Sequence, residues 1–322
     1  METEMRLAAE TAYPLVSVIL PTHNRAYCLP SAIGSVLGQT YKSFQLIIVD
    51  DASTDQTESL IAGMDDPRIE YVRNARNLGA AAARNVGVRQ AVGELLAFQD
   101  SDDQWLLEKL EFQVRRLHEL GETHGATFGG KILYGRDGSG RFGPDRVCFR
   151  PVGSSSISGG SIAGRLLQGN IISPQTLLLR KSAFDSAGSF DERLPANEDW
   201  EFMLRLSGVT NIDFTMRPLV VAKVSEDSIS YDDRRSARSF IIILGKLEAV
   251  LQQDEVSYCQ KLFALSTFLT RIGRFRAAER AVWRAIRLRP SALGGWLRLA
   301  RLKVNRVRRR MNLRTDAPPG RQ

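Results

Sequence analysis

The chain has 322 residues with an ordinary globular composition, 43% apolar and 25% charged, and can hold one large domain or two modest ones. No apolar run approaches the roughly 20 residues that a membrane-spanning helix needs, and the acidic N-terminus lacks a signal-peptide pattern. The net charge of +8 is uneven: residues 261–322 carry 17 Lys/Arg against two acids, which leaves residues 1–260 at −7, so the basic pI says little about the ligand of the acidic body.

Residues 16–99 alternate between short apolar runs and amphipathic stretches. The apolar runs are typical of buried strands, and apolar residues three and four apart predict helices between them. This alternation predicts a parallel sheet with right-handed crossovers. The expected strands are 16–20, 44–50, 68–72 and 94–99, and the expected helices are 29–39, 53–64 (capped by Ser53 or Thr54) and 79–91.

Residues 135–160 are rich in Gly and Ser and predict an irregular loop. The loop contains GSGRFG (138–143), which matches a dinucleotide-binding pattern, but Pro144 and a charged stretch follow it where a helix would be required. We therefore interpret these residues as turn glycines. Regular patterns resume afterwards, with SIAGRLLQG at 161–169, a strand at 175–180, a helix at 198–206, a strand at 217–224, and helices from about 233 onward with tetratricopeptide-like spacing at 273–290.

Three polar clusters follow the ends of predicted strands: PTHNR (21–25), DDASTD (50–55) and DSDD (100–103). Ligands of parallel sheets gather at the carboxyl ends of the strands, so the clusters should converge on one edge. In an extended segment Asp100 and Asp102 can share a face, and paired carboxylates suit magnesium or manganese. The alternative is that these acids cap a helix starting near Trp105, a role we expect for Asp103.

Four motifs, in order along the chain, carry a resemblance to a known family. They are VSVILPTHNR, SVLGQTYKSFQLIIVDDASTD, NLGAAAARNVGVRQAVGELLAFQDSDDQW and FDERLPANEDWEFMLRL. Over about residues 14–230 the chain resembles the family 2 glycosyltransferases with the GT-A fold. The resemblance implies an α/β domain with a Rossmann-like, mixed and mostly parallel sheet. It also implies a nucleotide-sugar donor, Mn²⁺ or Mg²⁺, and an inverting transfer to an acceptor hydroxyl.

The resemblance implies which residues hold the donor. Asp51 would accept a hydrogen bond from a pyrimidine imide N–H, although a turn-forming Asp is the alternative. Arg84 would lie near the base and ribose, or would instead pair with an acid of VDD (49–51). Asp102 matches the metal ligand of the D-x-D motif, and Asp100 the ribose or metal position. The implied nucleotide-binding set is Pro21, Thr22, His23, Asn24, Asp51, Asn77, Gly79, Arg84, Asp100 and Ser101.

Transfer to a hydroxyl also needs a base, because the hydroxyl attacks poorly until its proton is removed. In the family this role falls on the Asp of an "ED" pair, here Asp199 beside Glu198. The alternative is that the pair complements a helix dipole, which we expect of Glu198. Trp200 would wall the acceptor site or would be a core aromatic.

One position departs from the family pattern. Ser225 stands where many relatives carry a histidine that is thought to help with the metal or the diphosphate. Another cation would then be needed, and Lys223 and Arg234 are nearby in sequence.

The basic C-terminal stretch predicts an amphipathic helix from about 291 to 310. A basic helix of this kind with tryptophan is typical of an anionic membrane interface. The alternatives are that its apolar stripe packs on the helical subdomain or pairs with a second chain. The predicted stripe consists of Leu293, Trp296, Leu297, Ala300, Val304 and Val307.

These patterns predict an N-terminal tail at 1–13, a GT-A domain at 14–232, a basic helical subdomain at 233–311 and a disordered tail at 312–322. We expect transfer from a UDP-sugar to a glycan or lipid-linked acceptor in cell-surface polysaccharide synthesis, by a cytoplasmic protein peripheral on the inner face of the cytoplasmic membrane. The alternative is an inactive GT-A-like module that recruits partners or membrane through its tail.

Two further expectations concern partners and thiols. Nucleic acid is not an expected partner, because the acidic body lacks an aromatic-basic platform. The oligomeric state is left open. Cys28, Cys148 and Cys259 lack metal-ligand spacing and are expected to be reduced thiols.

Overall fold

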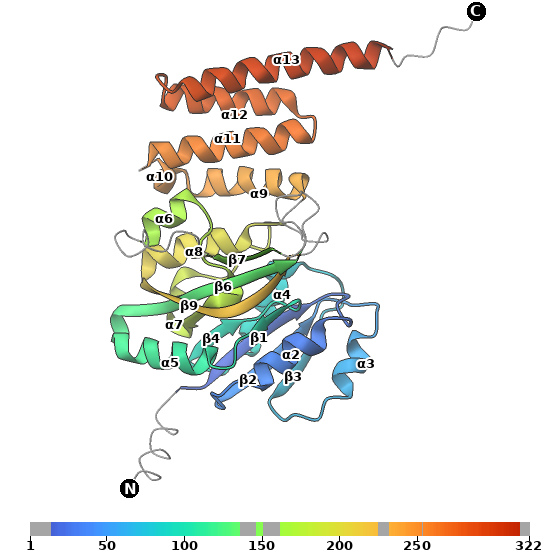
Figure 1. The fold of residues 1–322 in the computed structure, drawn as a ribbon, viewed down its shortest axis with the longest axis vertical. Coiled ribbons are helices and arrows are strands. Elements are labelled where there is room, and N and C mark those ends of the chain that lie inside the picture. The colour runs from blue at the N-terminus through green and yellow to red at the C-terminus, as the bar shows by residue number, and fades with distance from the viewer. Residues whose placement is uncertain (1–13, 136–145, 151–161, 225–231, 253, 316–322) are drawn as a thin grey trace, which may run out of the picture. The chain divides into compact units, whose positions relative to one another are not determined.

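The computed structural model describes residues 14–135, 146–150, 162–224, 232–252 and 254–315 (Figure 1). The chain divides into two compact units. Unit 1 comprises 1–193 and 198–228, and unit 2 comprises 194–197 and 229–322. The predicted domain limits at 14–232 and 233–311 stay predictions. The turn pattern at 138–143 and the departure at Ser225 lie outside the described residues.

The first half of unit 1 is the predicted alternation of strands and helices. Its four strands are parallel and lie in the order β3-β2-β1-β4, which confirms the expected βαβαβαβ arrangement. The elements are β1 (Val16–Thr22), α2 (Leu29–Leu37), β2 (Phe44–Asp50), α3 (Thr57–Ala62), β3 (Ile69–Arg73), α4 (Ala80–Gln90) and β4 (Leu95–Phe98).

The predicted cap of α3 is wrong. The helix begins at Thr57, and neither Ser53 nor Thr54 caps it. Both residues bond to the loop after β1 instead, where the Ser53 hydroxyl accepts from the Asn24 N–H at 2.9 Å and the Thr54 N–H donates to Asn24 Oδ1 at 2.7 Å.

The second half of unit 1 adds antiparallel pairings and makes the sheet mixed, as expected. The sheet continues β4-β8-β6-β9-β5, β7 pairs with β6 off this path, and β6 runs parallel to β9. The elements are β5 (Asp103–Trp105), α5 (Lys109–Leu120), the 3-10 helix η1 (Gly121–Thr123), β6 (His124–Gly135), β7 (Arg146–Arg150), α6 (Ile162–Gln168), the 3-10 helix η3 (Pro174–Thr176), β8 (Leu177–Arg180), α7 (Lys181–Ala187), α8 (Glu198–Val209) and β9 (Asn211–Val224).

Two expectations for this half are corrected. Asp103 does not cap a helix near Trp105, because both residues lie on β5, which pairs with β9, and α5 begins only at Lys109. Residues 135–160 are not an uninterrupted loop, because β7 lies within them.

The core of unit 1 forms where the helices cover the sheet. Val18, Leu20, Leu46 and Ile48 are fully buried beneath α2, and α4 lies against the other side of β1. The approach of α4 is close at Gly87, where an added Cβ would lie 2.4 Å from Ile19 Cγ2. This packing fixes the strand ends that carry the polar clusters.

Unit 2 is helical, as predicted from residue 233 onward. Figure 1 shows α9, α11, α12 and α13 stacked in a row, with α13 at its end. The stretch 273–290 contains one helix, α12, which packs between α11 and α13. Among the described residues, no helix is long and apolar enough to cross a membrane. The helices are α9 (Asp233–Lys246), α10 (Glu248–Leu251), α11 (Glu255–Arg271), α12 (Phe275–Leu288) and α13 (Leu293–Thr315).

Candidate active site

The loops after β1 and β2 meet at one edge of the sheet. The two strands are in parallel register to their ends, where Thr22 lies opposite Asp50. The ring of His23 bonds through Nδ1 to the Asp51 carbonyl at 2.8 Å, and Asn24 bonds to Ser53. Asn24 has a φ of 53°, a left-handed conformation that asparagine tolerates. These contacts hold the PTHNR and DDASTD clusters together, as predicted.

The Asp51 carboxylate is buried and accepts four hydrogen bonds from the chain itself. Oδ1 accepts from Asn74 Nδ2 at 2.8 Å and from the Leu78 N–H at 2.9 Å. Oδ2 accepts from the Leu78 N–H at 3.0 Å and from the Gly79 N–H at 2.7 Å. Asp51 therefore orders the loop at 74–79, and it is Asp50 that accepts from the Ser53 N–H within DDAST, at 2.8 Å. Contact of Asp51 with a base stays a prediction.

Gly79 and Asn77 shape the same loop. Gly79 has a φ of 88°, which favours glycine, and it precedes the first residue of α4. The exposed Asn77 accepts from the Gly79 N–H through Oδ1 at 3.1 Å. The loop thus presents α4, and with it Arg84, at the sheet edge.

Arg84 joins the two acidic motifs of the site. Its guanidinium donates to Asp100 Oδ1 at 2.9 Å and to Glu198 Oε1 at 2.7 Å, and the side chain is buried. Burial by itself would lower the pKa of Arg84, but the two carboxylates raise it above its ordinary value. The alternative expectation is that Arg84 pairs with an acid of VDD (49–51). Arg84 does form ion pairs, but its partners are Asp100 and Glu198.

The DSDD cluster holds three acids that repel one another. Burial first, and then Asp100, raise the pKa of Asp102, whereas Arg25 and Lys223 lower it. Burial, Asp100 and Asp102 raise the pKa of Asp103 to about 8, and this buried carboxyl accepts from Gln175 Nε2 at 2.7 Å. Asp103 is thus held from behind by the protein, while Asp102 stays partly exposed.

The carboxylate oxygens of Asp100 and Asp102 fit a hard divalent cation. Within the described part of the chain, no other residue donates a hydrogen bond to the Asp102 carboxylate, and Asp100 gives only one oxygen to Arg84. The Asp102 carboxylate, whose pKa burial raises, and the second oxygen of Asp100 are oxygen ligands of the kind that Mg²⁺ and Mn²⁺ take together with substrate phosphates. The described residues contain no group of three or more His, Cys, Asp or Glu that could hold a metal alone.

Asp199 lies in the first turn of α8, next to Glu198. Its Oδ2 accepts from Asn170 Nδ2 at 2.8 Å, and its Oδ1 accepts from the Trp200 N–H at 2.7 Å. Burial and the neighbouring Glu198 raise the pKa of Asp199 to about 6, against the opposing effects of Arg84 and these hydrogen bonds. A carboxyl with such a pKa can take up a proton near neutral pH.

Trp200 is a core aromatic, which is the alternative to a place in the wall of the acceptor site. Its indole is buried and donates through Nε1 to the Leu166 carbonyl at 2.7 Å. Pro21 is partly buried, whereas Thr22 and Ser101 are buried. Among the described residues, Thr22 Oγ1 has no hydrogen-bond partner.

Comparison with known proteins decides the family of this segment. The family model for Glycosyl transferase family 2 matches residues 17–149, which contain the loops after β1 and β2 and the DSDD cluster. This segment is a family 2 glycosyltransferase domain. The chain is 42% identical over 100 residues to the UDP-Glc:alpha-D-GlcNAc-diphosphoundecaprenol beta-1,3-glucosyltransferase WfgD of Escherichia coli, a match over 31% of this chain and 40% of that protein. The chain spans about two fifths of the length of the first curated relatives that it matches.

Solved structures show the same fold. TarS 1-349 of Staphylococcus aureus in complex with UDP-GlcNAc superposes with a TM-score of 0.58 at 20% identity, over 92% of both chains. The mannosyltransferase PcManGT of Pyrobaculum calidifontis in complex with GDP-Man and Mn²⁺ superposes with a TM-score of 0.58 at 17% identity, over 92% of this chain and 87% of that one. The GT-A-type fold predicted for the transferase domain is thereby confirmed.

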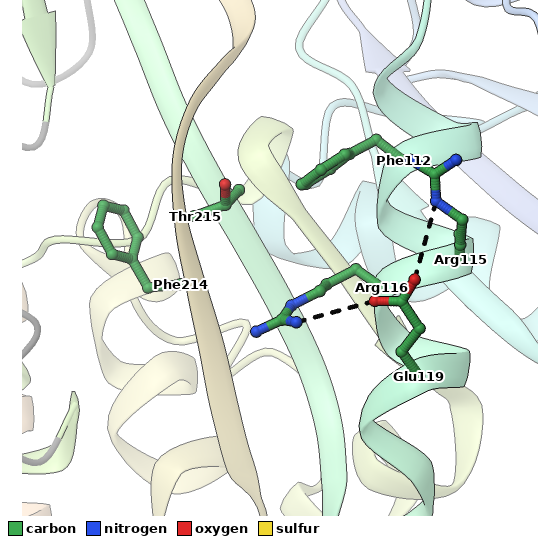
Figure 2. A pocket seen from close by; sticks show the side chains of 6 residues that line it. All are labelled: Phe112, Arg115, Arg116, Glu119, Phe214 and Thr215. Carbon is green, nitrogen blue, oxygen red and sulfur yellow. Dashed lines mark ion pairs between the residues drawn. The ribbon is translucent and has the colours of Figure 1, made fainter.

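A pocket of about 240 Å³ lies elsewhere on unit 1, between α5 and β9 (Figure 2). Figure 2 shows Arg115 and Arg116 turned toward Glu119, with Thr215 and Phe214 on the neighbouring strand. None of its lining residues belongs to the predicted donor or acceptor set, so we do not assign it to the transferase chemistry. The lining residues are Phe112, Arg115, Arg116, Glu119, Phe214 and Thr215.

Sequence reasoning missed the residues that hold the predicted ones. Asn170 contacts Asp199 from 29 residues away, Gln175 contacts Asp103 from 72 residues away, and Asn74 lies 23 residues from Asp51. Asn74 and Asn170 lie in loops and Gln175 lies in a three-residue 3-10 helix, so no periodic signal in the local sequence marked them. Of the cations considered for the diphosphate, Lys223 is exposed, and its field lowers the pKa of Asp102.

Proposed function

We propose that this chain is an inverting glycosyltransferase that moves a sugar from a UDP-sugar to a hydroxyl of a glycan or lipid-linked acceptor. The observation that carries the proposal is Arg84, which bonds at once to Asp100 of the donor motif and to Glu198, the neighbour of the proposed base. This buried cation links the motif proposed for the donor to the motif proposed for the acceptor. Such a cation fits a site that must hold donor and acceptor in register.

The donor would lie along the edge formed by the loops after β1, β2 and β4. Pro21, Thr22, His23 and Asn24 would line the base, with Asp51, Asn77, Gly79 and Arg84 near the base and ribose and with Asp100 and Ser101 at the ribose and diphosphate. The support is that the loops after β1 and β2 bond to each other and to Gly79, and that Arg84 of α4 bonds to Asp100 in the loop after β4. The UDP part of the proposal is supported by the donor in the name of WfgD.

Asp102 and Asp100 would hold the divalent cation. Bound Mn²⁺ or Mg²⁺ supplies positive charge beside the departing diphosphate. The family and the Mn²⁺ complex of PcManGT support this assignment.

Asp199 would take the acceptor proton. As the acceptor oxygen bonds to the anomeric carbon, the bond from that carbon to the diphosphate oxygen breaks, the proton passes to the carboxylate, and UDP leaves with the electron pair. A single displacement from the face opposite the diphosphate inverts the anomeric configuration. Glu198 would sit at the acceptor side, paired with Arg84, and Trp200 would support the site from the core.

The acceptor would belong to cell-surface polysaccharide synthesis. WfgD is named for a sugar carried on diphosphoundecaprenol, and a carrier of that kind is embedded in a membrane. We therefore propose that the chain works as a cytoplasmic protein on the inner face of the cytoplasmic membrane.

Donor hydrolysis tests the proposal. The intact chain is incubated with a panel of UDP-sugars and MnCl₂, and free UDP is measured with and without EDTA. We expect UDP release from one donor, and loss of that release with EDTA and in Asp102→Asn, because the cation site is then missing. Asp185→Asn, at an exposed aspartate of α7 paired with Lys181, is the matched control and should release UDP like the wild type.

Two results would contradict the proposal. Absence of UDP release with every donor and with lipid-linked acceptors would favour the inactive binding module. Equal release from wild type and Asp102→Asn, with both folded, would remove the metal assignment.

A further inference from the structure

The last helix of unit 2 is apolar on two opposite sides. Gly295, Leu299 and Leu302 are buried where α13 packs on the helices behind it. At 3.6 residues per turn, the stripe of Leu293, Leu297, Ala300 and Val304 lies on the other side of the helix. These four residues of the predicted stripe therefore do not pack on the helical subdomain, whereas Trp296 of the same stripe contacts Trp283 of α12.

The outward stripe is open to solvent. Leu293 is 77% exposed, Leu297 is 62% exposed and Val304 is 50% exposed. Trp296 extends the stripe and stacks edge-on against Trp283 of α12, with the ring centroids 5.6 Å apart and both rings more than two fifths exposed. We call the six residues Trp283, Leu293, Trp296, Leu297, Ala300 and Val304 the outer patch.

Most of the charge around the outer patch is positive. Residues 280–304 contain seven Lys/Arg, of which Arg284 is paired with Glu248, and no Asp/Glu, while Glu279 lies one turn of α12 before Trp283. On α13 the exposed Arg301 and Lys303 lie on either side of the stripe, about a quarter turn from its centre. An apolar stripe with cations on both sides matches a surface that has a hydrocarbon interior and negatively charged groups at its boundary with water.

We propose that the outer patch is a docking surface for an anionic phospholipid bilayer. A helix face is convex, which fits a planar lipid surface better than a peptide that needs a groove. A second copy of the same patch would bring cations against cations. Tryptophan is favoured at the membrane–water interface, and each cation near an anionic surface adds to the attraction.

The inference goes beyond the proposed transfer reaction and does not depend on it. The outer patch lies wholly in unit 2, whereas the donor and acceptor residues lie in unit 1. UDP release measured without vesicles reports on the transferase alone, so failure of one proposal is distinguishable from failure of the other.

Vesicle co-sedimentation of the full chain tests the docking surface. The vesicles are phosphatidylcholine alone or with about 30% phosphatidylglycerol, at about 0.05 M and about 0.5 M NaCl. We expect binding to the anionic vesicles only, weakened at high salt. Leu293→Ser/Leu297→Ser and Arg301→Gln/Lys303→Gln should each lower the partition constant at least about tenfold, which corresponds to about 1.4 kcal/mol.

Matched controls come from other helices of unit 2. Ile241→Ser/Val250→Ser removes two exposed apolar residues, and Arg235→Gln/Arg238→Gln removes two exposed cations of α9. Both should bind like the wild type, and circular dichroism verifies that all variants are folded.

Tryptophan fluorescence gives an independent measurement. Of the four tryptophans, Trp105 and Trp200 are buried in unit 1, so a blue shift on adding anionic vesicles reports Trp283 and Trp296. Absence of binding by the wild type overturns the proposal, as does equal weakening by patch and control variants. A dimer that the patch variants abolish, without vesicle binding, would identify a second copy as the occupant and would also overturn it.

Discussion

Arg84 and Asp199 show how neighbouring charges set the properties of single residues in this site. Arg84 stays charged in a buried position because two carboxylates share it. Asp199 has a raised pKa because burial and Glu198 outweigh the effect of Arg84. The same short network therefore holds one charge firmly and leaves another ready to accept a proton.

The proposed role of Asp199 as the base predicts the effect of one amide substitution. Asp199→Asn keeps the shape and the hydrogen bond to the Trp200 N–H but cannot take up a proton. Turnover should fall at least about a hundredfold, while UDP affinity should stay within about twofold. Steady-state kinetics and calorimetric titration with UDP measure the two effects. A large loss of UDP affinity with little loss of turnover would place Asp199 in donor binding instead.

Asn170 predicts a shift in the pH profile. Its amide donates to Asp199 Oδ2 and thereby favours the ionised carboxylate. In Asn170→Ala the pKa of Asp199 should rise above about 6, so activity on the acidic side is lost at higher pH than in the wild type. We expect kcat to fall several-fold near pH 6 and to recover toward pH 8, where Asp199 is deprotonated in both the variant and the wild type.

The pH dependence separates this role from a structural one. A change in the packing of Asn170 would lower kcat equally across the profile. Asn211→Ala is the control, because Asn211 donates to the Thr123 carbonyl and does not contact the site. A parallel, unshifted profile for Asn170→Ala would contradict the positioning role.

At the scale of elements, Gly87 decides how closely α4 lies on β1. Gly87→Ala would place a Cβ against Ile19 and Val49, and we expect it to lower the free energy of unfolding by about 1–3 kcal/mol. Gly34→Ala is the matched control, because the exposed Gly34 of α2 has open space at its Cβ, and alanine there should stabilise by about 0.5–1 kcal/mol. Urea denaturation of both variants measures the difference, and equal effects would contradict the packing argument.

The elements that sequence could predict are those that depend on local patterns. The strands at 16–20 and 44–50 are recognisable from their apolar runs. The polar clusters follow them at positions fixed by the parallel register of the two strands. Strand β5 could not be predicted, because its three residues are ordered by pairing with β9, more than 110 residues away. The same holds for Asp103, which the acidic sequence favoured as a cap and which the pairing places on a strand.

The residues of the candidate site also divide into those with a local signal and those without one. Sequence motifs singled out Asp100, Asp102 and Asp199, because each motif is a short stretch of the chain. The partner of Arg84 at Glu198 lies 114 residues away and follows only from the fold. On α13 periodicity found the apolar stripe, but the choice of packed face depends on Gly295, which lets the helix approach Ile286.

At the scale of the whole molecule, the two units should respond to different ligands. Unit 1 carries the acid clusters and the loops proposed to bind the donor, and the basic residues are concentrated in unit 2. UDP with Mn²⁺ should slow amide hydrogen exchange in the loops at 21–25, 50–55, 77–84 and 100–103. Phosphatidylglycerol vesicles should slow exchange in α12 and α13.

Hydrogen-exchange mass spectrometry on the full chain measures both footprints. Phosphatidylcholine vesicles and UDP with EDTA are the controls, and neither should reproduce the effects. Protection of α13 by UDP and Mn²⁺, or of the donor loops by anionic vesicles, would contradict the separation of the two functions.

The fully bonded carboxylate of Asp51 has a consequence for base selection. A carboxylate offers about four acceptor positions, and Asn74, Leu78 and Gly79 use all of them. A base that donates here must displace one of these partners, so it exchanges one bond for another and gains little affinity. A displaced N–H of Leu78 or Gly79 then needs a new acceptor, so the site favours a base that offers both a donor to Asp51 and an acceptor to that N–H over a base that offers only one of them. A base that binds at Asp51 therefore competes with the loop at 74–79 for the carboxylate oxygens.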